Sequence, residues 1–272
     1  MDTRTSDMIS FDSLVIGYAA GRHKRALLPP LSAVAAGGEF IAVIGRNGIG
    51  KSTLLRTITG LQSSLGGMIY INGSSLESIP RNYLARITGY ISTEAVRVSN
   101  MSVFDLIALG RFPHTNWIGS IDRVSYDVIT AAMEKTGMEE FRNRYVSELS
   151  DGERQRAMIA RLLAQDTALM VMDEPTAFLD IPGKYDIVNL LHNLTHEGRT
   201  IIFSTHDLNV AVNMADKIWL LLKDGLIAGS PEELIKNGSF NNLFESSLFG
   251  FDPESGNLAM KDGKHDHLKY FL

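Results

Sequence analysis

The chain has 272 residues, 44% of them hydrophobic, and a formal net charge of -5, so it is long enough to bury a substantial core. The net acidity argues against a protein held to nucleic acid mainly by phosphate neutralisation, and we expect no nucleic-acid partner. The absence of cysteine excludes disulfides, thiolate zinc sites and a cysteine nucleophile. The acidic N-terminus is unlike a signal peptide, and apolar runs such as ALMVM are far shorter than the roughly 20 residues of a membrane-spanning helix. We therefore expect a chain that does not cross a membrane itself.

The first informative stretch is GRNGIGKST, which matches the pattern G-x-x-x-x-G-K-[ST]. FIAVIG before it is apolar on both faces, as in a covered strand, and KSTLLRTITGL after it has the spacing of an amphipathic helix. In such a loop, backbone N–H groups surround an oxyanion, the lysine reaches the terminal phosphates and the serine hydroxyl ligates Mg²⁺. The alternative is a glycine-rich turn without a ligand. The residues expected to bind nucleotide are Gly45, Arg46, Asn47, Gly48, Gly50, Lys51, Ser52 and Thr53.

A helical insertion is predicted from about residue 92 to residue 146. VFDLIALGR, DVITAAMEKTG and MEEFRNRYV each have helical spacing, and no strand pattern lies between them. The next stretch, ELSDGERQRAMIARLL, begins with Ser150 and Glu153 in the S-x-x-E pattern of a capping box. Ser150 and Gly152 at an exposed helix N-terminus also form an anion-binding surface, so both interpretations can hold.

Two acidic residues follow the next apolar strand, in ALMVMDEP. Asp173 is the expected metal-side carboxylate, and Glu174 is placed to accept a proton from an attacking water. The alternative is an ordinary acidic turn before Pro175. His206 follows the strand TIIFST, and side chains at the carboxyl end of such strands point into the nucleotide crevice. We therefore expect Glu174, His206 and Lys51 to be catalytic.

The remaining segments complete an alternating pattern. The helix-like stretches KYDIVNLLHNLTHEG and LNVAVNMA lie around the strands TIIFST and KIWLLL. Strands that alternate with helices predict an α/β fold with a mostly parallel sheet. After residue 230, GSPEEL and FDPESGNLAM indicate a short helical and hairpin appendage spanning residues 231–272.

In this order, the motifs resemble those of an ATP-binding cassette (ABC) ATPase. LSDGERQ is similar to the family's signature sequence, VMDEP to its Walker B strand, FLD to its D-loop and STHD to its switch histidine. The resemblance implies a P-loop NTPase core at residues 9–230, with an N-terminal antiparallel β part and a helical subdomain inserted at about residues 92–160. It also implies that ATP and Mg²⁺ are the cofactors.

The family further implies a head-to-tail dimer, in which Ser150 and Gly152 of one copy contact the γ-phosphate held by Lys51 of the other. Asp180 belongs to the D-loop, and Tyr18 matches the family's adenine-stacking aromatic residue. A strand-edge tyrosine without a ligand is the alternative for Tyr18.

The chain departs from the family pattern in two places. Thr93 and Glu94 stand where a glutamine is usual, so a metal contact from this loop is in question. Asp151 and Glu153 replace the usual glycine and glutamine of the signature. A carboxylate near a γ-phosphate would repel it unless the carboxylate points away.

The stretch MSVFDLIALGRFPHTNW, residues 101–117, resembles the coupling region of importer ATPases that serve iron-siderophore, haem and cobalamin permeases. Its apolar residues include Leu109 and Phe112, and Arg111 and His114 are able to bind a partner's carbonyls or carboxylates. The alternative is that all of them pack inside the insertion. We expect that for the leucines, including Leu109, and for the isoleucine, and we expect contact with the partner for Arg111, Phe112 and His114. The resemblance implies an importer subunit at the cytoplasmic face of the membrane, with a permease as partner and a substrate-binding protein acting indirectly. An exporter ATPase or a non-transport ABC assembly factor remains the alternative function.

Overall fold

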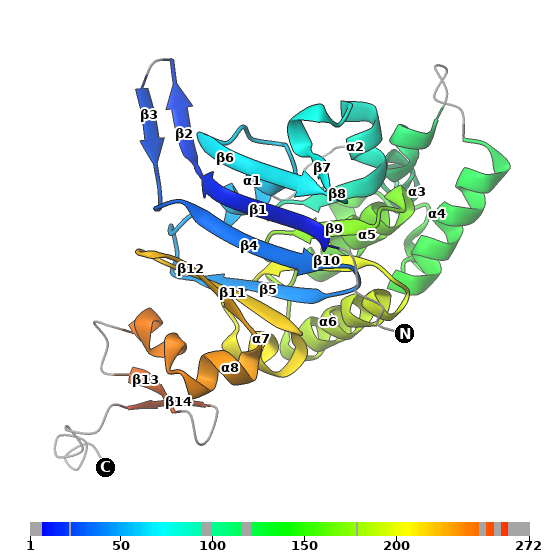
Figure 1. Ribbon diagram of the computed structural model, residues 1–272. Helices are drawn as coiled ribbons and strands as arrows, with labels where there is room; N and C mark the ends of the chain where they lie inside the picture. The colour runs from blue at the N-terminus through cyan, green and yellow to red at the C-terminus, as the bar shows by residue number, and fades with distance from the viewer. Residues whose placement is uncertain are drawn as a thin grey trace, which may run out of the picture.

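The computed structural model describes residues 7–21, 23–93, 100–115, 121–177, 179–244, 249–252 and 257–260. Figure 1 shows two β-sheets stacked in the middle of the molecule, with helices around them. Within the described ranges, no helix has the length and apolarity required to span a bilayer. Glu94, Phe178 and residues 116–117 of the coupling region, for which the sequence made predictions, lie outside these ranges, as do residues 261–272 of the predicted appendage.

The larger sheet has six strands in the order β12-β11-β5-β10-β9-β8. All its neighbouring pairs are parallel except β11 and β12, which confirms the prediction of a mostly parallel sheet. The strands are β5 (Phe40–Gly45), β8 (Thr88–Ile91), β9 (Leu169–Met172), β10 (Thr200–Ser204), β11 (Lys217–Leu222) and β12 (Gly225–Gly229).

Both faces of this sheet are covered, which explains its unbroken apolar runs. On β5, Phe40, Ala42 and Ile44 belong to one buried hydrophobic cluster, whereas Ile41 and Val43 belong to a second cluster. Successive side chains of a strand point to opposite faces, so each central strand contributes to both clusters.

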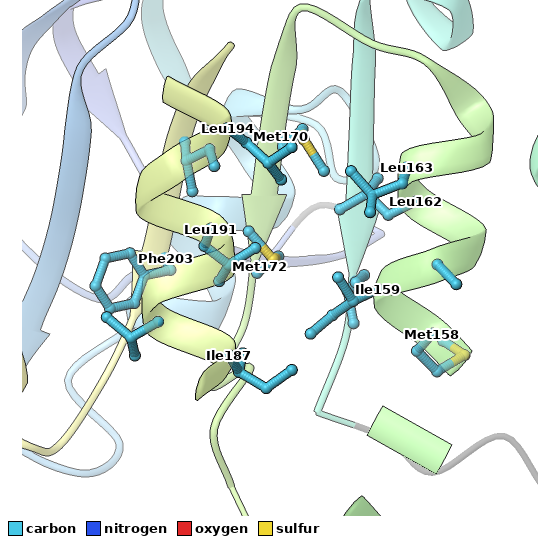
Figure 2. Packing of buried hydrophobic residues seen from close by; sticks show 14 of the residues in the cluster. Met158, Ile159, Leu162, Leu163, Met170, Met172, Ile187, Leu191, Leu194 and Phe203 are labelled. Atoms are coloured by element: carbon cyan, nitrogen blue, oxygen red, sulfur yellow. The ribbon is translucent and has the colours of Figure 1, made fainter. Parts of the chain in front are cut away.

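The first cluster packs helices against the sheet. Figure 2 shows side chains of helices α5 (Asp151–Gln165) and α6 (Ile181–His196) meeting the methionines of β9. The second cluster lies between the two sheets and includes the buried face of helix α1 (Lys51–Ile58). The large sheet and its loops are therefore held rigidly between two cores.

The smaller sheet is the predicted N-terminal antiparallel part. Its strand order is β4-β1-β6-β7, and a separate two-stranded hairpin, β2 with β3, projects beyond the end of β1 and the start of β4 (Figure 1). The strands are β1 (Asp7–Val15), β2 (Gly17–Ala20), β3 (His23–Ala26), β4 (Leu31–Ala36), β6 (Gly66–Ile71) and β7 (Ser74–Ser75). The short turn η1 (Leu76–Ser78) and helix α2 (Arg81–Ile87) lead from this sheet to β8.

The insertion between β8 and α5 contains helices and no long strand within its described residues, as predicted. Helix α3 (Val103–Ala108) continues into the 3₁₀ segment η2 (Leu109–His114), and helix α4 (Arg123–Thr136) packs against α5. Ser102 starts α3 with a reciprocal capping box to Asp105, and Asp122 caps α4. The capping side chains satisfy backbone N–H groups that have no partner inside the helix.

The prediction of a third helix in MEEFRNRYV was wrong. This stretch contains only two short 3₁₀ turns, η3 (Glu139–Phe141) and η4 (Val146–Glu148). The backbone between the turns pairs instead with the start of α3: Val103 and Phe104 donate their N–H groups to the carbonyls of Arg144 and Arg142. Those carbonyls are therefore not free to accept bonds from an α-helix of their own.

The last third of the chain contains the remaining predicted elements. Helix α6 starts at Ile181, earlier than the apolar pattern indicated, because the Asp180 carboxylate caps it. Helix α7 (Leu208–Met214) lies between β10 and β11 in the chain. Beyond residue 230, the described residues form the short helix α8 (Pro231–Lys236), the 3₁₀ segment η5 (Ser239–Phe244) and a hairpin of β13 (Phe249–Asp252) with β14 (Asn257–Met260).

Candidate nucleotide-binding site

The glycine-rich loop joins β5 to α1, as its sequence requires. Gly48 and Gly50 have φ angles of 76° and 118°, in the left-handed region where glycine is favoured. Gly45, at the end of β5, lies so close to β11 that an added Cβ would be 2.7 Å from the Leu221 carbonyl oxygen. Helix α1 has no side-chain cap and no acidic residue in its first turn. Its first N–H groups and its positive dipole end are thus available to an anion.

Lys51 is a buried cation within this loop. Its Nζ donates to the carbonyl oxygen of Gly45 at 2.9 Å and to that of Arg46 at 3.5 Å. Burial lowers the pKa of Lys51, and the nearby carboxylates of Glu174 and Asp173 partly oppose that shift. A poorly solvated ammonium group gains more from a bound phosphate than an exposed one would.

Asp173 follows β9 and faces the same loop. Its side chain is buried, one oxygen accepts a hydrogen bond from Ser204 Oγ at 2.6 Å, and the other accepts from Thr93 Oγ1 at 3.2 Å. A fixed carboxylate and the half-buried Ser52 hydroxyl are hard oxygen ligands of the kind Mg²⁺ prefers, so these residues fit that ion. Ser204 was not among the predicted site residues. The only signal for it was its place at the end of β10.

Glu174 and His206 meet directly. The Glu174 carboxylate pairs with Nε2 of His206, and the backbone N–H of Glu174 donates to Ser204 Oγ at 2.9 Å. Glu174 has a φ of 51°, which is uncommon for a non-glycine residue. The local backbone is thus held in a strained conformation that directs this carboxylate toward the histidine.

Tyr18 lies on β2, in the projecting hairpin, and approaches the P-loop from outside the sheet. Its hydroxyl group is 3.2 Å from Thr53 Oγ1, yet 57% of the residue is exposed. The ring therefore has one end anchored at the loop and a large surface accessible to a planar ligand.

Ser150 forms the predicted capping box at the start of α5. Its N–H and hydroxyl groups lie 2.7 and 2.9 Å from Glu153 Oε2, and Glu153 donates its own N–H back to Ser150 Oγ. The hydrogen bond from the Ser150 N–H lowers the pKa of Glu153 despite some burial, and the Ser150 hydroxyl and Arg144 act in the same direction. Glu153 is therefore turned into the cap.

Asp151, the less usual signature residue, is paired within its own helix. Its Oδ1 lies 2.6 Å from Nη1 of Arg154, and the other Arg154 terminal nitrogen donates to the Leu149 carbonyl at 2.8 Å. Arg154 thus offsets the added negative charge at this helix end.

The predicted site residues fall into two groups. The P-loop, Thr93, Asp173, Glu174 and His206 form one cluster, whereas Gly152 lies beside Leu179, near Asp180, at the start of α6. Across the described ranges, no hydrogen bond or ion pair joins Ser150 or Asp180 to the P-loop. Among the described residues, the two groups therefore make no direct polar contact within one copy.

In the region resembling the importer coupling segment, two predictions were wrong. Arg111 is 6% exposed and binds the Ala164 carbonyl, and His114 hydrogen-bonds the Gln165 carbonyl, so both are used inside the subdomain. Leu109 was expected to pack inside but is exposed, and Phe112 is 73% exposed. The 3₁₀ geometry of η2 differs from a continued α-helix and redirects these side chains.

Comparison with known proteins identifies the fold and this arrangement of motifs. The family model described as "ABC transporter" matches residues 28–177. The chain belongs to the ABC transporter family. It has the ATP-binding subunit's motifs, and its activity is accordingly ATP hydrolysis coupled to transport.

ABC transporter relatives match most of the chain. The ferric enterobactin transport ATP-binding protein FepC of Escherichia coli is 35% identical over 82% of this chain and 82% of that protein. The iron(3+)-hydroxamate import ATP-binding protein FhuC of Bacillus subtilis is 35% identical over 87% of each. An inward-facing structure of a putative metal-chelate type ABC transporter has a TM-score of 0.71 at 26% identity, covering 84% of this chain and 85% of that chain.

Proposed function

We propose that this ABC protein is the ATPase subunit of an importer for a metal chelate, such as an iron-siderophore, haem or cobalamin. The observation that carries the proposal is the near full-length similarity to ATP-binding proteins named for ferric enterobactin and iron-hydroxamate transport. ATP-binding subunits of this family dimerise and work with membrane permeases. The chain itself would lie at the cytoplasmic face of the membrane.

In this proposal, the P-loop holds the triphosphate. Lys51 neutralises the terminal phosphates, and the loop's N–H groups bind their oxygens. Ser52 and Asp173 would hold Mg²⁺, which supplies charge neutralisation on the phosphates. Thr93 is too short to replace a glutamine. Its hydrogen bond to Asp173 supports a role in orienting that carboxylate.

Glu174 acts as the general base that orients the attacking water and accepts its proton. Its pairing with His206 holds the carboxylate at the carboxyl ends of β9 and β10. His206 in turn is exposed enough to contact the γ-phosphate once nucleotide is present. Loss of a positioned base typically costs about 10²- to 10⁴-fold in rate.

Two copies of the chain are required for a complete site. Ser150 and Gly152 of one copy would contact the γ-phosphate bound by the other, and Asp180 would lie at the same interface. Among the described residues, the lack of a direct polar contact between the two groups within one copy supports this arrangement, because neither group alone surrounds a triphosphate. ATP binding would close the dimer and hydrolysis would reopen it, thereby moving the permease.

The permease would dock on the region of residues 101–117. The exposed side chains of Leu109 and Phe112 support this, because they offer an apolar surface on the helical subdomain. Arg111 and His114 support the surface from inside through their bonds to the carbonyls at the end of α5. A substrate-binding protein would act on the permease from the other side of the membrane.

The decisive experiment for the ATPase cycle uses Glu174→Gln. The variant should still bind ATP but hydrolyse it about 10²- to 10⁴-fold more slowly, and it should elute as a dimer at saturating ATP in size-exclusion chromatography with light scattering. The wild type with ADP serves as the monomer control. A variant that stays monomeric with ATP, while the wild type hydrolyses normally, contradicts the two-site mechanism.

Transport is tested separately, by purification from membranes of the source cell. We expect the chain to copurify with a polytopic permease, and Phe112→Asp to abolish copurification without changing the isolated protein's nucleotide binding. Leu61→Asp, at an exposed apolar residue outside the proposed docking region, is the control. A chain that never copurifies with a membrane protein would favour the non-transport alternative, and a permease partner that exports its cargo would favour the exporter.

A further inference from the structure

The β2–β3 hairpin has a register that pairs Tyr18 with an arginine. Tyr18 is directly opposite Arg25, and the next pair along the hairpin is Ala19 with Lys24. In an antiparallel pair, residues directly opposite each other project from the same face of the ribbon. Arg25 and Tyr18 therefore share one face, and Lys24 lies on the other.

The base of the hairpin shows which face is turned to the P-loop. The N–H of Leu27 donates to the Ile16 carbonyl at 3.0 Å, so these two residues extend the same register. An added Cβ on Gly50 would lie 3.2 Å from Ile16 Cδ1 and 3.3 Å from Leu27 Cδ1. The side chains of Ile16 and Leu27 thus cover the P-loop directly.

Side chains alternate between the two faces along each strand, so the residues that share a face with Ile16 and Leu27 can be named. Tyr18 is two residues after Ile16, and Arg25 is two residues before Leu27, so both return to the face that is turned to the P-loop. The contact between the Tyr18 hydroxyl and Thr53 Oγ1, at 3.2 Å, independently agrees with this for Tyr18. The hairpin is also fixed at its base, because Gln62 Nε2 donates to the Gly17 carbonyl at 2.6 Å.

Arg25 has no partner of its own to explain its position. It is exposed, and among the described residues its guanidinium makes no hydrogen bond or ion pair. An arginine carries five N–H donors in a planar fork, which suits ring nitrogens, ribose hydroxyls and phosphate oxygens. Unlike Lys51, it belongs not to the loop but to the hairpin, directly opposite Tyr18.

We propose that Arg25 is a nucleotide-binding residue that donates to the nucleoside side of the bound nucleotide: the base edge, the ribose or the α-phosphate. This rests on the proposed binding of ATP between the P-loop and Tyr18. Lys51 contacts the carbonyls at the start of the loop, whereas Tyr18 reaches Thr53 in α1. The hairpin therefore meets the nucleotide at the end opposite to its terminal phosphates, and Arg25 binds ATP and ADP alike.

The test measures binding of ADP and of a non-hydrolysable ATP analogue to the full chain by isothermal titration calorimetry. Arg25→Ala should weaken both nucleotides by the same factor, about 3- to 10-fold for the loss of a partly exposed charged hydrogen bond. Lys24→Ala is the matched control, because it removes the same charge from the adjacent residue on the opposite face. It should leave both dissociation constants within about twofold, as expected for a screened surface charge.

The outcomes separate this inference from the proposed function. Weakening by Arg25→Ala but not by Lys24→Ala, equal for both nucleotides, supports the assignment. If both variants weaken nucleotide binding equally, Arg25 contributes only net charge. If Arg25→Ala weakens only the ATP analogue, its contact is to the γ-phosphate. Either result overturns the inference. If the wild type binds neither nucleotide, the proposed function itself fails.

Discussion

The Asp151 carboxylate and the Arg154 guanidinium, one helical turn apart at the start of α5, lie 2.6 Å from each other. Asp151 occupies a position where ABC signatures usually have glycine, and at this helix end it would face the phosphate of a partner copy. Arg154 compensates the charge, and its second contact to the Leu149 carbonyl fixes the pair in place. The unusual residue is therefore compatible with an active signature.

Removal of Arg154 should leave the charge of Asp151 without a partner and so reveal its effect on the signature. We expect Arg154→Ala to lower the ATPase rate and ATP-driven dimerisation, because Asp151 then presents an uncompensated charge to the γ-phosphate. Asp151→Gly alone should retain activity. It should change the free energy of unfolding by about 1 kcal/mol or less, because the Asp151 side chain is 66% exposed and exposed ion pairs contribute little. The double variant should recover activity relative to Arg154→Ala. A double variant as impaired as Arg154→Ala would show that the contact to Leu149 matters instead.

Lys51→Met should separate binding from stability. Burial disfavours the lysine charge in the free protein, so its replacement by an apolar side chain of similar length should leave the free energy of unfolding without nucleotide equal or higher. In the wild type, ATP at 100 times its dissociation constant should add about 2.7 kcal/mol to that free energy. The variant should lose this increment in urea titrations with and without ATP. An unchanged increment would mean that Lys51 does not bind phosphate.

Glycine is required more strongly at position 50 than at position 48. Both have positive φ angles, but only at Gly50 would a Cβ meet side chains, those of Ile16 and Leu27. Gly48→Ala should cost about 1–2 kcal/mol of unfolding free energy from the left-handed backbone. Gly50→Ala should cost more, because it also displaces the base of the hairpin. Chemical denaturation of the two variants side by side measures the difference, and equal losses would show that the hairpin moves without cost.

Stability should depend on pH through Glu153. Its pKa in the folded protein is lowered, first by the Ser150 backbone N–H. Relative to an unfolded value of about 4.3, the ionised cap therefore stabilises the fold above that pH and loses its effect as pH falls through the lower folded pKa. Glu153→Gln keeps an acceptor for the Ser150 N–H but removes the charge, so it should reduce the free energy of unfolding at pH 7 by about 0.3–1 kcal/mol. The gap between wild type and variant should narrow below about pH 4. If the difference in unfolding free energy between wild type and variant does not change with pH, the Glu153 charge does not stabilise the fold.

The sequence by itself determined the local parts of this protein. The β5 run, the glycine loop and α1 are contiguous, and residues within one turn of each other fix the loop's geometry and the cap at Ser150. For the same reason, the α/β alternation and the positions of Asp173, Glu174 and His206 at strand ends could be predicted from pattern alone.

Only the tertiary structure decided what depends on residues far apart in the chain. Arg111 was expected to face a partner, but Ala164, 53 residues away, provides a carbonyl that binds it internally. Asp173 accepts hydrogen bonds from Ser204, at the end of β10, and from Thr93, in the loop after β8. The position of Arg25 opposite Tyr18 is set by the register of the hairpin. Side-chain direction at such positions depends on long-range packing and backbone pairing, which local propensity does not contain.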